Sequence, residues 1–289
     1  MSSVGLHAGF DHAGYYSEDL AGARDRFAAM GFTVTPPARF AEQAFATCAI
    51  MTGDTYVSIS GVLDWTGVPD WMRQGMGRGV QAFVLRSHNL DALYAETGPE
   101  GTAELQFDGT VDSIARTARI AGRDERVAFK VLRLKRQSLP GLSRVNFCQH
   151  LTPDTMWHPS LLTHANRTVA LKAVTAVHEE PASALDFYRR LFGRAELDAA
   201  GDLTVDCGST SLRLVRPARL GEIWPNGFAP AFESGTPLLA GLTLTTKDAA
   251  AARRYLAAAG VETAGTSGGG IAVASRDAYG AVLEFVPET

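Results

Sequence analysis

The chain contains 289 residues, a length that is long for one hydrophobic core and suits two domains of ordinary size. Its hydrophobic content of 46% and charged content of 20% are typical of a soluble globular protein. A net charge of −4 excludes the strongly basic surface on which nucleic-acid binding depends.

The first ten residues, MSSVGLHAGF, have neither the charged leader nor the apolar segment of a signal peptide. No stretch approaches the roughly 20 apolar residues that span a bilayer. Cys48, Cys148 and Cys207 each lie in an apolar segment, and their odd number and wide spacing argue against disulfides or zinc. We therefore expect a cytoplasmic protein with buried free thiols and no membrane contact.

One short order of predicted secondary structure occurs four times along the sequence. Each copy begins with an apolar segment of strand type, continues into a short helix followed by a glycine, and ends in further strands. Glycine is favoured after a helix because it adopts the left-handed conformation at little cost. The copies begin with Gly9–Phe32, Gly79–Gly98, Arg167–Gly193 and Ala240–Val261, and the glycines are Gly31, Gly98, Gly193 and Gly260.

Polar residues precede each helix, where they can accept hydrogen bonds from the free N–H groups of the first turn. The candidates are Ser17 or Glu18, Ser87 to Asn89, Glu179 or Glu180, and Thr246 to Asp248. The strand segments alternate apolar and polar residues, which indicates a sheet with one covered face. One such unit cannot bury both faces of its small sheet, so the copies must pair.

Three irregular segments interrupt the repeats. Leu151–Arg167 separates the two halves of the chain, Arg216–Pro237 separates copies three and four, and Leu63–Gly79 separates copies one and two. An insert of about 20 residues in a compact domain is more often a functional lid or wall than filler. The segment between copies one and two brings Trp65 and Trp71, which could line an apolar pocket.

Short motifs within this plan indicate a family. They are Asp11-His12 in the first strand, a helix ending in MGF, the stretch CQHLTPDTMWHP from Cys148 to Pro159, and HAN from His164 to Asn166. With the four copies, they resemble the vicinal oxygen chelate superfamily, which includes glyoxalase I, extradiol dioxygenases and bleomycin-resistance proteins. The first half is most similar to the glyoxalase-like domains of that superfamily.

The resemblance implies an α+β fold in which four βαβββ modules pair into two vicinal-oxygen-chelate domains. Residues 1–155 would form a glyoxalase-like domain with two modules, whose strands would close into a cup that holds the candidate active site. Residues 165–289 would form a second two-module domain that is mainly structural. Pairing of copy one with copy four, and of copy two with copy three, remains an open alternative.

The resemblance also implies a divalent metal ion, Fe, Zn, Mn or Ni, held by terminal strands of the modules. His12 in the first strand of copy one, His150 in the last strand of copy two and Glu284 in the last strand of copy four match ligand positions. Other such positions carry residues that are poor ligands or none: Ser58, Ala82, Ala173 and Gly241. The third ligand would be Glu284, Asp154, His158 or His164, because most catalytic sites use three protein ligands.

Structural roles for the same residues stay open. His12 can equally be a core histidine bonded to a backbone carbonyl, and His150 can be held by Gln149 or Thr152. Glu284 either faces solvent or points into the second cup.

The expected substrate pocket includes Trp65, Trp157, His158 and His164. Two classes of function fit this sequence. One is a metal-dependent lyase, isomerase or dioxygenase that acts on a small oxygenated metabolite, either aromatic or aliphatic. Its metal would be a Lewis acid that stabilises an enolate or oxyanion. The other is a non-catalytic binding protein of the resistance type. The expected partners are a small-molecule substrate and, as an open alternative, a second copy of the chain in a homodimer.

Overall fold

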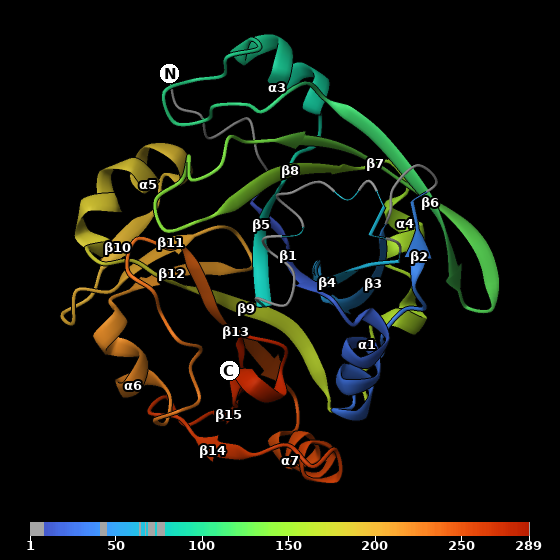
Figure 1. Cartoon of the computed structure of the whole chain (residues 1–289), viewed down its shortest axis with the longest axis vertical. Helices are drawn as coiled ribbons and strands as arrows, with labels where there is room; N and C mark the ends of the chain where they lie inside the picture. The colour runs from blue at the N-terminus through green and yellow to red at the C-terminus, as the bar shows by residue number, and fades with distance from the viewer. Residues whose placement is uncertain are drawn as a thin grey trace.

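The computed structural model describes residues 9–40, 45–63, 65–66, 68, 73 and 79–288, so Trp71 lies outside the described residues. Figure 1 shows helices around the periphery of a continuous, strongly curved sheet. None of the helices in the described ranges combines the length and the apolar composition needed to cross a bilayer.

The first half of the chain contributes eight strands and two of the longer helices. In chain order its elements are β1 (Phe10–Ser17), α1 (Leu20–Ala29), β2 (Ala38–Arg39), β3 (Phe45–Thr52), β4 (Thr55–Val62), β5 (Gly79–Arg86), α3 (Leu90–Thr97), β6 (Asp112–Ile120), β7 (Arg123–Arg133) and β8 (Arg144–His150). The segment that joins the halves contains α4 (Pro153–Met156) and the 3₁₀ helix η2 (Pro159–Leu161).

The second half repeats this order of strand, helix and three strands twice. Its elements are β9 (Thr168–Val177), η3 (Pro181–Ala184), α5 (Leu185–Phe192), β10 (Ala195–Leu197), β11 (Leu203–Asp206), β12 (Ser211–Val215), η4 (Pro217–Arg219), α6 (Leu220–Ile223), β13 (Leu238–Thr246), α7 (Ala249–Ala258), β14 (Thr263–Gly265), β15 (Ile271–Val273), η5 (Ser275–Asp277) and β16 (Val282–Pro287).

The strands form one sheet of mixed direction, which confirms the expected α+β class. In each half, the first strands of two successive repeats lie side by side and antiparallel: β1 with β5, and β9 with β13. Each of these strands also pairs in parallel with the last strand of its own repeat: β4, β8, β12 or β16. A single register pair, Leu239 with Val80, joins β13 to β5 and so links the two halves.

The helix ends follow the sequence signals closely, with two corrections. Neither Glu179 nor Glu180 caps α5, because the 3₁₀ helix η3 comes first and Ala184 is at the N-cap of α5. Asp19, not Ser17 or Glu18, caps α1, because its carboxylate accepts a hydrogen bond from the N–H of Gly22. Asn89 and Asp248 cap α3 and α7 in the same way, as expected. The three cysteines are buried and free, which confirms the prediction.

The two halves share one hydrophobic core. Phe27 of α1 packs near Phe32 and Tyr279, and Phe32 stacks on Phe285 of β16 at a centroid distance of 5.9 Å. Arg26 adds an ion pair of 2.7 Å to Asp277 across the same interface. The halves are therefore held together by buried apolar area and not by a flexible linker.

The irregular segment Arg216–Pro237 packs partly against the strands of the second half. It folds into η4 and α6, and the indole of Trp224 at the end of α6 is only 1% exposed. Trp224 packs in an apolar cluster with strand residues on that side, among them Val177, Val215 and Val282. The insert is thus part of the core of the second half.

The contact between Trp224 and β13 depends on a glycine. A Cβ atom built on Gly241 would lie 2.5 Å from Cη2 of Trp224. We therefore expect Gly241→Ala to lower the free energy of unfolding by about 1–3 kcal/mol, as overpacked core substitutions do. Denaturant unfolding monitored by tryptophan fluorescence would measure the change.

Gly265→Ala in β14 is the matched control, because nothing lies within 4 Å of a Cβ built there. It should change the stability by less than about 0.5 kcal/mol. Equal effects of the two substitutions would contradict the packing of Trp224 against Gly241.

Candidate active site

The central feature of the first half is a carboxylate in a β-bulge. Along the β1–β5 ladder, Phe10 pairs with Leu85 and His12 pairs with Val84, so Asp11 is an extra residue with no partner on β5. A bulge bends the strand and redirects the side chains beside it. This irregularity allows Asp11 and His12, which are adjacent in the chain, to meet at one point.

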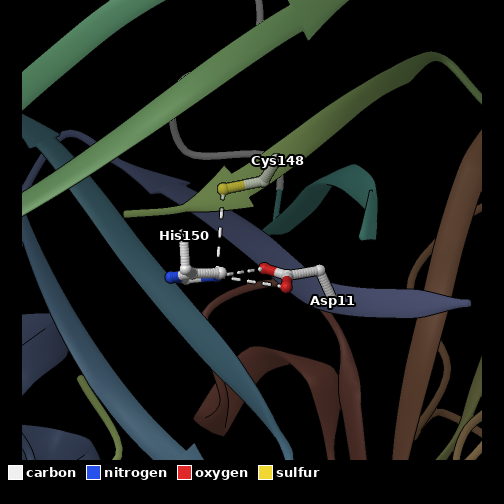
Figure 2. Close-up of side chains that lie close together, drawn as sticks. All are labelled: Asp11, Cys148 and His150. Atoms are coloured by element: carbon white, nitrogen blue, oxygen red, sulfur yellow. Dashed lines mark hydrogen bonds and ion pairs between the residues drawn. The ribbon is translucent and has the colours of Figure 1, made fainter. Parts of the chain in front are cut away.

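Three side chains from three strands converge on the carboxylate of Asp11. Nδ1 of His12 lies 2.7 Å from one oxygen, and Nε of Arg86 in β5 donates to the other at 2.9 Å. Nε2 of His150, at the end of β8, lies 3.1 Å from both oxygens. Figure 2 shows His150 between Asp11 and Cys148, whose sulfur is 3.9 Å from the same Nε2.

Asp11 is ionised in this environment although it is 0% exposed. Burial alone would raise the pKa of Asp11, but the charge interaction with His150 and the hydrogen bonds from His12 and His150 hold this pKa well below its usual range. Burial also lowers the pKa of His12, although the hydrogen bond to Asp11 and the charge of Asp11 act to raise it. We therefore assign His12 as neutral, with Nδ1–H donated to Asp11 and Nε2 left as proton acceptor.

A cavity of about 160 Å³ lies beside this cluster, between the strands of the first half. Its wall is made of alternate residues of successive strands, as the two-residue period of a strand requires. Gly14 of β1 pairs with Ser58 of β4 on one side and with Ala82 of β5 on the other. Because all three side chains are small, they leave the cavity open at this position. Polar and aromatic side chains make up much of this lining: His12, Phe40, Phe45, Thr47, Tyr56, Ser58, Ser60, Arg116, Phe129, Asn146 and Cys148.

Comparison with known proteins identifies the family. A family model described as a glyoxalase-like domain matches residues 10–192, more than half of the chain. The chain belongs to the glyoxalase-like domain family. No curated protein sequence matches it significantly.

Solved structures share the fold of this glyoxalase-like protein at low identity. A hypothetical protein from Staphylococcus aureus is 12% identical with a TM-score of 0.65, covering 96% of this chain and 99% of its own. A mutant of 4-hydroxymandelate synthase from Streptomyces coelicolor is 12% identical with a TM-score of 0.61, covering 98% and 93%. A variant of homoprotocatechuate 2,3-dioxygenase from B. fuscum is 12% identical with a TM-score of 0.55, covering 98% and 71%. The fold is that of the vicinal oxygen chelate superfamily.

The structure brings two of the three expected metal ligands to one place. His12 and His150 both contact Asp11, and not the backbone carbonyl, Gln149 or Thr152 considered from the sequence. Glu284 does not join them. It is 5% exposed in β16, inside the second half, where its carboxylate accepts a hydrogen bond of 3.1 Å from Thr243.

The four residues expected in the substrate pocket are dispersed. Trp65 is 40% exposed, under the guanidinium of Arg73, and lies outside the cavity lining. Trp157 packs edge-on against His150 at 4.7 Å and lines a separate cavity of about 420 Å³. His158 bonds to Ser160 and lines a third cavity.

His164 takes a structural position. Its Nδ1 accepts a hydrogen bond of 3.0 Å from the N–H of Thr33, and its Nε2 donates to the carbonyl of Met51 at 2.7 Å. Asn166, two residues later, donates to the carbonyl of Met30. The HAN motif thus connects the start of the second half to the segment after α1.

Sequence reasoning missed Cys148 and Arg86 as members of this cluster. Cys148 stands two residues before His150, so the strand period placed both on one face of β8. Arg86 was not foreseen, because its approach to Asp11 depends on the bulge in β1. An aspartate inside the apolar strand GFDHAGYY was itself a signal, since buried carboxylates need partners.

Asp11, Cys148 and His150 form a group that could hold a metal ion. Their potential ligand atoms all lie within 4.8 Å of one another. Ligands of one tetrahedral zinc ion, with bonds of about 2.0–2.3 Å, lie roughly 3–4 Å apart. The separations of 3.1 Å and 3.9 Å around Nε2 of His150 are of this size, so the donor set fits a divalent ion.

We expect Asp11→Asn to lower the free energy of unfolding at neutral pH by about 3 kcal/mol, because Arg86 loses its buried counter-charge. The folded pKa of Asp11 is below its unfolded value, near 3.9. Its contribution is therefore present above about pH 4 and is lost as the pH falls toward the folded pKa. Urea unfolding of both proteins from pH 8 to pH 3 would show a difference that persists at pH 5 and shrinks below about pH 4.

Asp124→Asn serves as control, since Asp124 forms an exposed ion pair with Arg119. It should cost less than about 0.5 kcal/mol. A difference between wild type and Asp11→Asn that disappears between pH 7 and pH 5 would contradict the assignment of Asp11 as a strongly acidic, buried group.

Proposed function

We propose that the protein is a metal-dependent enzyme that acts on a small oxygenated metabolite in the cup of its first half. The observation that carries this proposal is the convergence of Asp11, Cys148 and His150 directly behind the cavity, whose wall contains Cys148 and His12. A buried carboxylate, imidazole and thiol together are rare without a function in binding or catalysis.

The proposal includes the architecture behind the cup. Four βαβββ modules would pair as one with two and three with four, so that residues 1–155 form the working domain and residues 165–289 a mainly structural one. The antiparallel pairs β1–β5 and β9–β13 support this arrangement. Trp224 supports the structural role of the second domain, because its buried ring packs on Gly241 within an apolar cluster of that half.

Asp11, Cys148 and His150 would hold the ion. The mixed oxygen, nitrogen and sulfur donors favour Zn or Fe among the four candidate metals. When bound, the ion would act as a Lewis acid toward an oxygen of the substrate.

His12 would move a proton at the substrate. Asp11 fixes the tautomer of His12 through Nδ1, and the stacked ring of Tyr56, at 4.2 Å, fixes its plane. Nε2 is then the acceptor, with the orientation that a general base requires. Phe40, Phe45 and Phe129 exclude water from the cavity, which strengthens each polar contact within it.

A second candidate function, a binding protein of the resistance type, has its own support. Two strand positions at which the superfamily would place metal ligands carry Ser58 and Ala82, which are poor ligands or none. In addition, Nδ1 of His150 has no hydrogen-bond partner among the described residues, whereas a metal-bound histidine usually donates its other N–H group. Either substrate turnover or simple sequestration would use the same cavity.

Metal content separates the two candidates. In protein purified without added metal, we expect one divalent ion per chain by mass spectrometry of the bound metals. Cys148→Ala and His150→Ala should each weaken metal affinity by at least about 100-fold, as loss of a direct ligand exceeds the effect of an outer-shell change. The affinity should also fall as the pH is lowered, because protons compete for His150 and Cys148.

Two control variants use groups of the same chemistry in the second half. Cys207→Ala removes another buried thiol, and Glu284→Gln removes another buried carboxylate. Both should leave metal content unchanged. Protein without metal that still binds small molecules saturably would favour the binding protein, and loss of metal in Glu284→Gln would favour the pairing of copies one and four.

A further inference from the structure

Arg116 is a buried cation in the wall of the cavity. It lies in β6, where Ile114, Ala118 and Ile120 occupy the neighbouring positions of the same strand face. Its exposed fraction is 7%, and it contributes to the lining of the cavity. A charged residue on an otherwise apolar strand face breaks the pattern of the strand and requires an explanation.

The protein holds the guanidinium of Arg116 in place without neutralising it. Nη1 donates to the carbonyl of Thr47 at 3.2 Å, while the rings of Phe40 and Phe129 lie 5.1 Å and 5.8 Å from Cζ. These cation–π contacts fix the plane of the group. Nε is buried and has no hydrogen-bond partner in the described part of the chain.

No carboxylate of a described residue forms an ion pair with Arg116. Arg133, which also lines the cavity, differs in this respect because it pairs with Asp112. Arg116 thus has free hydrogen-bonding capacity and an uncompensated charge.

We propose that Arg116 is the anchor for the carboxylate of a small, single-ring substrate anion in this cup. A planar guanidinium with free donors matches a carboxylate in shape and charge, and such a pair is strong where water is excluded. The incoming anion would supply the counter-charge and the acceptor that Arg116 needs.

The rest of the cavity limits the size and type of that anion. Its volume of about 160 Å³ is close to that of an engineered cavity of ~150 Å³ that holds benzene. Phe40, Phe45, Phe129 and Tyr56 provide aromatic surface for one ring. Thr47, Ser60 and Asn146 offer hydroxyl and amide groups for further oxygen substituents.

This inference deepens the proposed function, because it assumes that the cup of the first half is the substrate site. It does not depend on the metal. Binding measured on metal-free protein therefore tests Arg116 separately from the group formed by Asp11, Cys148 and His150.

The test is calorimetric titration of the full chain, in EDTA at neutral pH, with benzoate and with its neutral analogue benzamide. We expect wild type to bind benzoate about 10- to 100-fold more tightly than benzamide, the range given by a hydrogen bond to a charged group. Arg116→Met should remove this preference. Arg116→Lys should restore part of it, because lysine keeps the charge without the planar pair of donors.

Arg119→Met is the matched control on the same strand. Arg119 is exposed and pairs with Asp124, so benzoate affinity should be unchanged. Equal binding of benzoate and benzamide, no binding of either, or full benzoate affinity in Arg116→Met would each overturn the proposal.

A second measurement covers the case in which substitution of a buried arginine prevents folding. In wild-type protein labelled with ¹⁵N-arginine, benzoate should shift one Nε–Hε resonance and benzamide should not. A spectrum unchanged by benzoate would overturn the proposal. Benzoate binding in a protein that never takes up metal would leave it intact while refuting the metal-dependent enzyme.

Discussion

The buried carboxylate of Asp11 is the interaction on which the first half depends. Removing an ion from water costs several kcal/mol in a protein interior, so Asp11 is tolerated only because partners reach it from several strands. His12 comes from β1 itself, Arg86 from β5 and His150 from β8. These strands belong to two successive repeats, so one carboxylate fixes the register of the repeats relative to each other at the edge of the cup. The same contacts orient His12 and His150, so the structural and the chemical roles of Asp11 are inseparable.

The two halves show how similar strand pairings lead to different interiors. In the first half, the small side chains at Gly14, Ser58 and Ala82 leave a cavity. In the second half, Trp224 enters from the insert between β12 and β13 and packs on Gly241. An aromatic ring supplied by the chain thus packs against the first strand of the fourth repeat, whereas the corresponding part of the first half is open. This difference supports the proposal that the substrate site lies in the first half.

The sequence predicts the features that depend on local chemistry and on periodicity. Glycine at the helix ends, acidic or amide caps such as Asn89 and Asp248, and the buried thiols all follow from short-range patterns. The α+β class was implied by the family resemblance. The approach of His12 and His150 was predicted through family resemblance, which placed both on terminal strands. The division at Leu151–Arg167 remains a prediction, and the family match to residues 10–192 extends beyond that segment into α5.

Features that depend on long-range geometry were not predictable from the sequence. The bulge at Asp11 exists only against β5, so no local pattern showed that Asp11, rather than His12, is the common partner. His164 looks like a ligand in the HAN motif, yet both of its ring nitrogens bond to backbone groups of distant segments. Glu284 lies at an expected ligand position, but its strand belongs to the other half.

The charges of the cup define an orientation for what it binds. At one side Arg86 compensates the negative charge of Asp11, and the neutral imidazole of His12 and the thiol of Cys148 line the cavity there. Elsewhere in the wall, Arg116 keeps a positive charge with no carboxylate of the described residues beside it. An anion would therefore place its negative end at Arg116, and its ring would lie against Phe40 and Phe129. Its remaining polar groups would then face His12. In this proposal, electrostatics set the direction of the substrate, while the volume of the cavity limits its size.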